Sequence, residues 1–225
     1  MERYKRNMTM LSQEENDELK SFKVCVVGCG GLGGYIIEML GRLGIGSITA
    51  VDGDVFEASN LNRQILSDMS SLGISKAKKA QERMALVNPL VEIRPLHTRL
   101  SGENSREILQ GHHVIVDALD NIPSRFILQK TCEALDIPLV HGAIAGWYGQ
   151  VTTIMPGDRT LDDIYTQGTA KGVEQELGNP SFTPALIASI QVSEVLKVLI
   201  QRGDLLRRKI LYVNLLDQEY EIINL

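Results

Sequence analysis

A glycine-rich segment between two regular patterns constrains the fold of this chain more than any other feature. Residues 28–33 read Gly-Cys-Gly-Gly-Leu-Gly, and the apolar run 23–27 precedes them. After the glycines, apolar residues recur at helical spacing over 34–43, and a second apolar run follows at 47–51. Two buried strands joined by a helix form a β-α-β unit, and such units build parallel sheets with right-handed crossovers.

The same alternation of strand and helix patterns continues along the chain. Further helices are predicted at 75–87, 105–110, 123–135 and 184–200, and further strands at 91–96, 114–119, 139–141, 150–155, 209–214 and 219–224. Because a short polar turn separates the last two strands, we expect them to form an antiparallel hairpin. The pattern predicts an α/β fold with a doubly wound, Rossmann-like, mainly parallel sheet and an antiparallel C-terminal extension.

Two segments lie outside this alternation. Residues 1–21 form an N-terminal arm, in which residues 12–15 have the pattern of a capping box that opens a short helix. Residues 157–182 are polar and glycine-rich with little periodicity, so they are predicted to form a long crossover loop. We expect residues 1–225 to form one domain.

Composition and charge exclude several classes of protein. With 225 residues, 44% of them hydrophobic, and a net charge of −5, the chain is neither disordered nor collagen-like and has no evident basic surface for nucleic acid. No apolar run approaches the ~18 residues of a membrane span, and the first residues lack the apolar core of a signal peptide. We therefore expect a cytoplasmic protein that acts neither on a membrane nor on nucleic acid.

Cysteine and histidine are too sparse for a disulfide framework or a zinc cage. The chain has three cysteines, no two of them at C-x-x-C spacing, and four histidines, of which His112 and His113 open an apolar run. A magnesium ion with oxygen ligands remains open, because it needs only one or two carboxylates together with phosphates.

The glycine segment has the context of a nucleotide site. Between a strand and a helix, glycines permit a tight turn and let backbone N–H groups approach a phosphate closely. Asp52 ends the second strand at about the 20-residue spacing where an acid binds ribose hydroxyls. The pair indicates a nucleotide with a ribose and phosphates, and on its own it suits a dinucleotide oxidoreductase as well as an enzyme that uses a triphosphate.

The residues after this acid favour a triphosphate. Residues 59–64, Ser-Asn-Leu-Asn-Arg-Gln, place Arg63 among several amides, and transfer from a triphosphate requires its negative charge to be neutralised. Lys76 begins the next predicted helix, and Asp120 with Asn121 follows a later strand at the carboxyl edge of the sheet. Each also has a plain structural interpretation, with Arg63 and Lys76 as solvated surface charges and Asp120 as a helix cap.

Together these motifs resemble the family of ubiquitin-activating-like adenylyltransferases that includes MoeB, ThiF and HesA. The resemblance runs from Arg3 to the C-terminus. It rests on the glycine segment, on Asp52 with the Ser-Asn-Leu-Asn-Arg-Gln stretch, on Lys76, on Ala118-Leu119-Asp120-Asn121, and on Gly142-Ala143 with Gly149-Gln150-Val151. The stretch after Asp52 is far more specific than the glycine segment alone.

The resemblance implies a reaction that uses ATP and Mg²⁺. Members of this family adenylate the C-terminal glycine of a small ubiquitin-fold sulfur carrier of the ThiS/MoaD type, which ends in Gly-Gly. Pyrophosphate is released, and the carrier is then thiolated for cofactor biosynthesis. By this resemblance the ATP-binding residues are Gly28, Gly30, Gly31, Gly33, Asp52, Asn60, Arg63, Gln64, Lys76 and Asn121, the magnesium ligand is Asp120, and the catalytic residues are Arg6, Arg63, Lys76 and Asp120.

Family members are usually homodimers in which an N-terminal arginine reaches the ATP of the partner, and Arg6 matches that arginine. Many members bind zinc with two C-x-x-C pairs, which this chain lacks, so we expect no zinc. Members that form a thioester or persulfide carry a cysteine in the crossover loop, and residues 157–182 contain none. Sulfur would then come from another protein, or the adenylate would be used otherwise.

Other functions stay open beside this one. An ATP-dependent dehydratase that acts on a modified tRNA adenosine belongs to a related branch, and the acidic chain counts against it. A non-catalytic nucleotide-binding scaffold would not need Arg63, Lys76 and Asp120 together. An NAD oxidoreductase is more distant still. The resemblance leaves the carrier and its pathway open, whether thiamin, molybdenum or tungsten cofactor.

Overall fold

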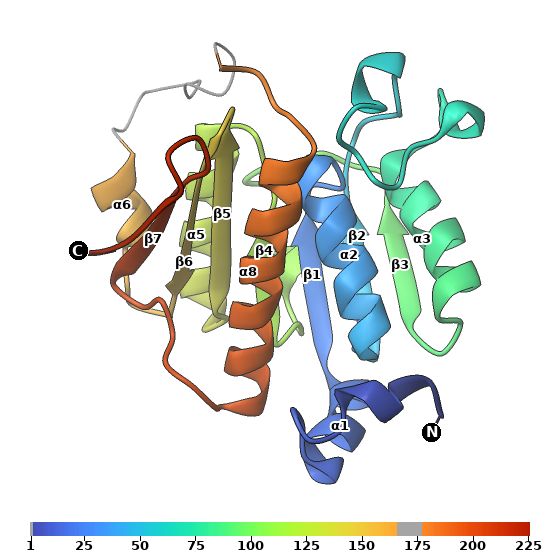
Figure 1. Ribbon diagram of the computed structural model, residues 1–225, viewed down its shortest axis with the longest axis horizontal. Coiled ribbons are helices and arrows are strands. Elements are labelled where there is room, and N and C mark those ends of the chain that lie inside the picture. Colours follow the sequence, from blue (N-terminus) through green and yellow to red (C-terminus); the bar gives the residue numbers. More distant parts are fainter. Residues whose placement is uncertain (1, 166–176) are drawn as a thin grey trace.

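The strands of the computed structural model, which describes residues 2–165 and 177–225, form an eight-stranded sheet (Figure 1). The strands lie in the order β3-β2-β1-β4-β5-β6-β7-β8. Their bounds are β1 Lys23–Val27, β2 Ser47–Val51, β3 Glu92–Leu96, β4 Val114–Asp117, β5 Leu139–Ala145, β6 Tyr148–Ile154, β7 Lys209–Asn214 and β8 Glu219–Asn224. Neighbours are parallel from β3 to β5 and antiparallel from β5 to β8, so the predicted fold class is confirmed.

Helices cover both faces of this sheet (Figure 1). One face packs against α2 (Gly31–Leu43), α3 (Lys76–Val87) and α8 (Phe182–Ile200), and the other against α4 (Ser105–Leu109), α5 (Ile122–Leu135) and α6 (Thr160–Ile164). The N-terminal arm contains α1 (Gln13–Glu18) and two 3₁₀ turns, Glu2–Asn7 and Leu19–Ser21. It lies at the end of the sheet where the parallel strands begin (Figure 1).

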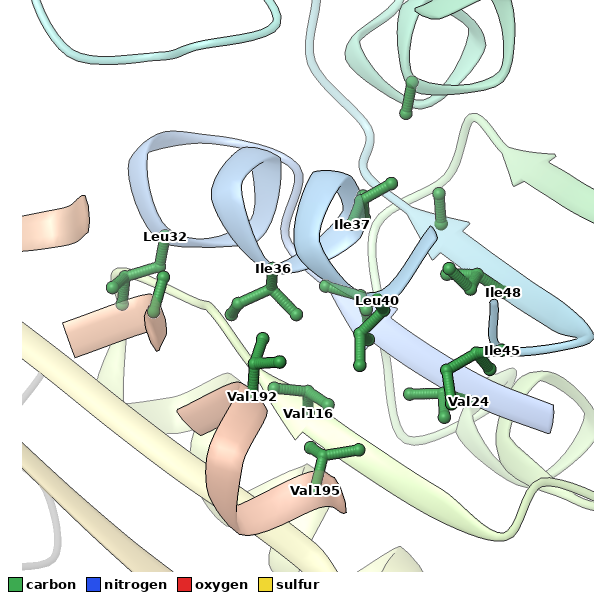
Figure 2. Packing of buried hydrophobic residues seen from close by; sticks show 14 of the residues in the cluster. Val24, Leu32, Ile36, Ile37, Leu40, Ile45, Ile48, Val116, Val192 and Val195 are labelled. Carbon is green, nitrogen blue, oxygen red and sulfur yellow. The ribbon is translucent and has the colours of Figure 1, made fainter. Parts of the chain in front are cut away.

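The predicted β-α-β unit forms the centre of the larger core. The first strand is buried after its first residue, and α2 ends at Gly44, whose φ of 96° is the left-handed conformation that favours glycine. Ile36 on α2 faces Val192 on α8 (Figure 2), and neither the isoleucine nor its neighbour Ile37 has exposed surface. Burial of one such side chain stabilises the fold by about 2 kcal/mol.

The capping box predicted at the end of the arm is confirmed. The hydroxyl oxygen of Ser12 accepts a hydrogen bond from the backbone N–H of Glu15 at 3.1 Å. In return, the backbone N–H of Ser12 donates to the Glu15 carboxylate at 2.7 Å. The two bonds satisfy N–H groups that a helix start otherwise leaves unpaired.

The predicted crossover loop is wrong in its first part. Residues 160–164 form α6, and the side chain of Gln129 on α5 accepts a hydrogen bond from the backbone N–H of Leu161 at 2.8 Å. A helix of five residues is too short to show a periodicity in the sequence, so only the tertiary contact reveals it. Residues 166–176 of the predicted loop lie outside the described residues.

Within the described ranges, α8 is the one helix that meets the length and composition of a membrane span. Half of its apolar window is buried in the protein, where α8 packs on α2 and on the sheet. Its apolar character is therefore explained by its place in the core.

Candidate functional site

A cavity of about 540 Å³ opens at the carboxyl ends of β1, β2 and β4. The strand order reverses between β1 and β4, and open α/β sheets bind their ligands at such a switch point. Nine residues singled out in the sequence line this cavity: Gly28, Gly30, Gly31, Asp52, Arg63, Gln64, Lys76, Asp120 and Asn121.

Close backbone contacts explain two of the glycines. Gly28 has a φ of +99°, and a Cβ atom at this residue would lie 2.4 Å from the carbonyl oxygen of Ala118. A Cβ atom at Gly33 would lie 1.7 Å from the carbonyl oxygen of Gly28. Without side chains at these positions, α2 can begin directly against β1 and β4. Its first turn borders the cavity, and the N–H groups of a first helical turn are suited to bind phosphate.

The Asp52 carboxylate is fixed at the wall of the cavity by two backbone groups. One oxygen accepts a hydrogen bond from the N–H of Cys29 and the other from the N–H of Asp54, both at 2.8 Å. Each carboxylate oxygen has a further lone pair, so the group can also accept hydrogen bonds from the hydroxyls of a ribose. This geometry suits the role expected for Asp52.

Two cations border the cavity beyond this acid. The Arg63 guanidinium donates to the carbonyl oxygen of Ser59 at 3.0 Å and to the side-chain oxygen of Asn62 at 2.9 Å, so its direction is set by its own loop. Lys76 is buried, and its ammonium lies 3.7 Å from a carboxylate oxygen of Asp54. The interpretation of Lys76 as a solvated surface charge is therefore wrong, because burying a lysine is costly unless its charge is used.

Two buried amide oxygens at the cavity have no hydrogen-bond partner among the described residues. They are Oε1 of Gln64 and Oδ1 of Asn179. An unpaired buried polar group costs about 1–3 kcal/mol, and the oxygen and nitrogen of such an amide can exchange places. A ligand rich in donors and acceptors, such as a nucleotide, would satisfy both side chains.

Asp120 and Asn121 have different environments although they are adjacent. The Asn121 side chain caps α5, because its oxygen accepts from the backbone N–H of Ser124 at 3.0 Å. Asp120 is exposed at the cavity. The cap that the sequence also allowed for Asp120 is therefore made by its neighbour, and the Asp120 carboxylate is available to a ligand.

Three residues named from the resemblance do not line the cavity within the described residues. Gly33 packs against the glycine turn, and Asn60 is buried, with its side-chain oxygen accepting from the backbone N–H of Glu57 at 3.1 Å. Arg6 lies in the arm, where the next residue, Asn7, donates to the carbonyl oxygen of Leu43 at the C-terminal end of α2. The cavity is at the opposite end of this helix of 13 residues, about 20 Å away.

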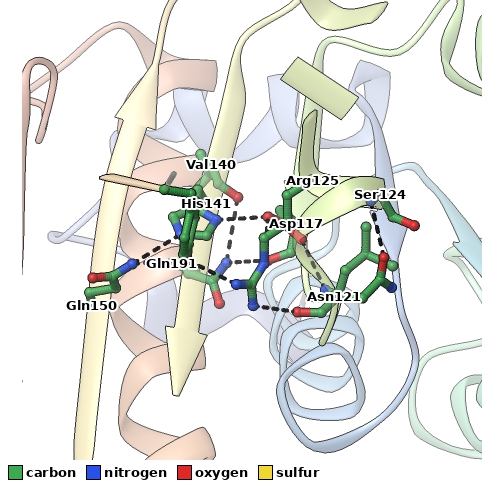
Figure 3. A network of polar contacts seen from close by, with 10 residues as sticks. Asp117, Asn121, Ser124, Arg125, Val140, His141, Gln150 and Gln191 are labelled. Atoms are coloured by element: carbon green, nitrogen blue, oxygen red, sulfur yellow. Dashed lines mark hydrogen bonds and ion pairs between the residues drawn. The ribbon is translucent and has the colours of Figure 1, made fainter. Parts of the chain in front are cut away.

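A buried polar network that no sequence motif indicated lies next to the cavity residues Asn121 and Ser124 (Figure 3). Asp117 and His141 have no exposed surface, and Arg125 is 4% exposed. The Nδ1 atom of His141 lies 2.7 Å from a carboxylate oxygen of Asp117. Burial lowers the pKa of His141 below its ordinary value, although the hydrogen bond to Asp117 opposes this shift. Asp117 and His141 lie in apolar strands and Arg125 lies in α5, where sequence patterns suggest only core.

The described residues contain no cluster of three or more His, Cys, Asp or Glu side chains that could hold a metal ion. A magnesium ion bound together with a triphosphate needs fewer protein ligands, because phosphate oxygens and water complete its shell. The exposed carboxylate of Asp120 at the cavity fits that requirement.

The chain is similar to proteins of one family along nearly its whole length. The model of the ThiF family matches residues 4–225. The SAMP-activating enzyme E1 of Haloferax volcanii is 34% identical over 228 residues, which cover 99% of this chain and 84% of that protein. The sulfur carrier protein adenylyltransferase of Thermus thermophilus is also 34% identical, over 98% of this chain and 85% of that protein.

Solved structures share the fold at lower identity. A crystal structure of E. coli MccB with MccA-N7isoASN has a TM-score of 0.85 and 18% identity, and it covers 99% of this chain and 71% of the MccB chain. PaaA has a TM-score of 0.79 and 22% identity, over 93% of this chain and 66% of the PaaA chain.

Proposed function

The chain belongs to the ThiF family, and from that premise we propose that it is an ATP-dependent adenylyltransferase for a small ubiquitin-fold carrier protein. The C-terminal glycine carboxylate of a carrier that ends in Gly-Gly attacks the α-phosphorus of ATP. The bond between the α-phosphorus and the bridging oxygen breaks, pyrophosphate leaves, and the carrier keeps AMP as an acyl-adenylate. Sulfur from a donor then attacks the acyl carbon, AMP leaves with the bridging oxygen, and the carrier becomes a thiocarboxylate for cofactor biosynthesis.

The arrangement of charge around the cavity is the observation that carries this proposal. Asp52 lies beside the glycine segment, while Arg63, Lys76 and Asp120 border the same cavity. An attacking carboxylate is already charged, so the reaction needs no nucleophile or base from the protein. It needs orientation of the reactants and neutralisation of the phosphates, which fixed charges supply.

Each residue then has a defined task. Asp52 accepts hydrogen bonds from the ribose hydroxyls, and the first turn of α2 receives phosphate oxygens. Arg63 and Lys76 neutralise the charge that accumulates on the leaving pyrophosphate. Asp120 would hold a magnesium ion, which supplies further neutralisation of the phosphates when bound.

Sulfur chemistry on this chain's own thiols is not part of the proposal. Cys25, Cys29 and Cys132 are all buried. Burial raises the pKa of the Cys132 thiol to about 12 and holds the pKa values of the other two thiols far above the ordinary range. A thiol is reactive only as the thiolate, so sulfur would come from another protein. Free thiols and ATP also suit the cytoplasm, where we place the reaction.

The position of the N-terminal arm bears on how many chains the proposed reaction uses. We propose that the protein is a homodimer of single-domain chains, in which Arg6 of one chain reaches the phosphates bound by the other. The position of Arg6, remote from the cavity of its own chain, supports this arrangement. An arginine suits the task because its planar charge can bind two phosphate oxygens.

Exchange of labelled pyrophosphate into ATP tests the proposed function. We expect exchange only when a small ubiquitin-fold carrier ending in Gly-Gly from the same genome is present, and none with the same carrier after removal of its last glycine. Exchange absent with every such carrier would contradict the proposal, as would tight binding of NAD in place of ATP. Turnover of ATP with a modified tRNA would favour the dehydratase.

A further inference from the structure

We propose that Asp117, His141 and Tyr165 are positioning residues, which hold the cavity segment 118–121 in place through the Arg125 guanidinium. The inference rests on the proposed function, because this segment carries Asp120. None of the three contributes to the chemistry directly. Their contacts determine where the segment lies.

Two hydrogen bonds hold the segment at Leu119, one to its backbone N–H group and one to its carbonyl oxygen. Asp117 is the last residue of β4, and one of its carboxylate oxygens accepts a hydrogen bond from the backbone N–H of Leu119 at 2.9 Å. The Arg125 guanidinium donates to the carbonyl oxygen of Leu119 at 2.7 Å. Asp120 is the next residue after Leu119, and it lines the cavity. The path of the backbone into Asp120 is therefore set by Asp117 and Arg125.

Arg125 is in turn held by buried groups. Its Nε atom lies 3.7 Å from a carboxylate oxygen of Asp117, and its Nη1 atom donates to the Tyr165 hydroxyl at 2.9 Å. The guanidinium also lies over the Tyr165 ring, 5.2 Å from its centre. The Asp117 carboxylate and the hydroxyl and ring of Tyr165 together restrain this guanidinium, and so orient its hydrogen bond to Leu119.

The Asp117 carboxylate assigns the proton of His141. A carboxylate accepts hydrogen bonds, so Nδ1 of the neutral ring donates to Asp117 and Nε2 is left as an acceptor. The Tyr165 hydroxyl lies 3.1 Å from Nε2, and the amide nitrogen of Gln150 lies 3.5 Å from it. The hydroxyl oxygen also accepts hydrogen bonds from Arg125 and, at 3.0 Å, from Gln150.

The result is a directed chain from Tyr165 through His141 to Asp117, closed by Arg125. Figure 3 shows Asp117 between His141 on one side and Arg125 on the other. The side chain of Gln191 on α8 adds a hydrogen bond to the backbone carbonyl oxygen of Asp117 at 2.9 Å. In a closed network of this kind, loss of one member leaves buried partners unpaired and loosens the others.

Loss of this network should affect the use of magnesium and the binding of ATP differently. The Asp52 carboxylate is held by the backbone N–H groups of Cys29 and Asp54, outside this network. Loss of the Tyr165 hydroxyl should therefore leave ATP affinity nearly unchanged, while it displaces Asp120 and weakens the use of magnesium.

The substitution Tyr165→Phe tests this inference, with Tyr148→Phe as a matched control. Tyr148 lies on β6 of the same sheet, and its hydroxyl makes no hydrogen bond within the described residues. For Tyr165→Phe we expect the rate of pyrophosphate exchange to fall about tenfold, because a small displacement of a catalytic group costs about this factor in rate. The Mg²⁺ concentration that gives half of the maximal rate should rise. The KM for ATP should stay within about twofold of wild type, since Asp52, which should bind the ribose, lies outside the displaced segment.

A second substitution tests whether the residues act as one unit. His141→Asn keeps a donor near Asp117 but removes the acceptor for Tyr165. We expect its effect to match that of Tyr165→Phe, and the double variant to be no worse than either single variant. Independent, additive losses would contradict a common network.

Hydrogen exchange gives a readout that does not depend on activity. We expect the backbone amides of 118–121 to exchange faster in Tyr165→Phe than in wild type or Tyr148→Phe. Unchanged exchange and an unchanged Mg²⁺ requirement would overturn the inference, as would a parallel loss of ATP affinity and thermal stability. If wild type shows no carrier-dependent reaction but the segment still loosens in Tyr165→Phe, the proposed function fails and the positioning network stands.

Discussion

Asp120 and Asn121 are adjacent but have different roles, which the sequence alone could not assign to one residue or the other. The Asn121 side chain stabilises the start of α5, and the Asp120 carboxylate is exposed at the cavity. We expect Asp120→Asn to lose several kcal/mol of transition-state stabilisation in pyrophosphate exchange, because a charge that holds a metal is lost. Its thermal unfolding should match wild type. Asn121→Ala should instead cost about 1 kcal/mol of stability, as loss of an N-cap does.

Exchange rates at saturating magnesium, together with thermal melts of both variants, check this expectation. Activity of Asp120→Asn within a few-fold of wild type would show that its carboxylate has no part in the reaction.

The lowered pKa of His141 makes stability depend on pH. Burial beside Asp117, Arg125 and Tyr165 keeps the folded ring neutral below the ordinary pKa of about 6.5, while an unfolded histidine takes up a proton there. The free energy of unfolding should therefore fall as pH drops below about 6.5, by at most about 1.4 kcal/mol per pH unit from this group.

Urea unfolding at several pH values measures this slope. We expect this slope to be flatter in His141→Asn than in wild type. Burial also lowers the pKa of His112, so part of the slope should persist. Equal slopes in wild type and His141→Asn would count against a buried neutral ring.

At the scale of elements, the glycine turn fixes how closely α2 approaches the sheet. A Cβ at Gly33 would lie 1.7 Å from the carbonyl oxygen of Gly28, and backbone atoms on both sides leave no room for adjustment. Gly33→Ala should therefore destabilise the protein by about 3 kcal/mol or more. Gly102→Ala is the control, because a Cβ there meets nothing within 4 Å. Chemical denaturation measures the free energy of unfolding of both variants, and equal values would contradict the close contact.

The sequence predicts elements best where one pattern dominates. The strands Lys23–Val27 and Ser47–Val51 and the hairpin strands β7 and β8 agree with prediction because their apolar runs are bounded by turns. α2 begins three residues earlier than its predicted start at 34, since glycines carry no apolar signal. The strand predicted at 139–141 continues to Ala145, because its pairing with β6 extends it.

The candidate site, like the helices and strands, could be predicted only in part from the sequence. Motifs in the chain identify many of the residues that line the cavity, but Arg125, which also lines it, meets His141 and Tyr165 only through the tertiary fold. These residues are far apart in the sequence and belong to no common motif, so no local pattern could reveal the network.

For the whole molecule, we have proposed that Arg6 acts in the site of a partner chain. We expect Arg6→Ala and Asp120→Asn each to be nearly inactive as homodimers. After the two variants are mixed and subunits exchange, about half of the dimers contain one chain of each, as random pairing in a two-fold dimer requires. One site in each mixed dimer then has both groups.

Exchange activity should recover to about a quarter of wild type, because about a quarter of all sites are complete. If Arg6 served the cavity of its own chain, every site in the mixture would lack one group. No recovery after subunit exchange has been demonstrated by mass spectrometry would contradict action across the dimer.

In the proposed reaction, a carrier carboxylate attacks the α-phosphorus of ATP. An isotope experiment follows the oxygen of that carboxylate, with a Gly-Gly carrier whose C-terminal carboxylate is labelled with ¹⁸O. After reaction with ATP and cleavage of the product by hydroxylamine, we expect AMP to carry one labelled oxygen, since the bridging oxygen of an acyl-adenylate comes from the carboxylate. Unlabelled AMP, or formation of ADP with labelled phosphate, would contradict the account.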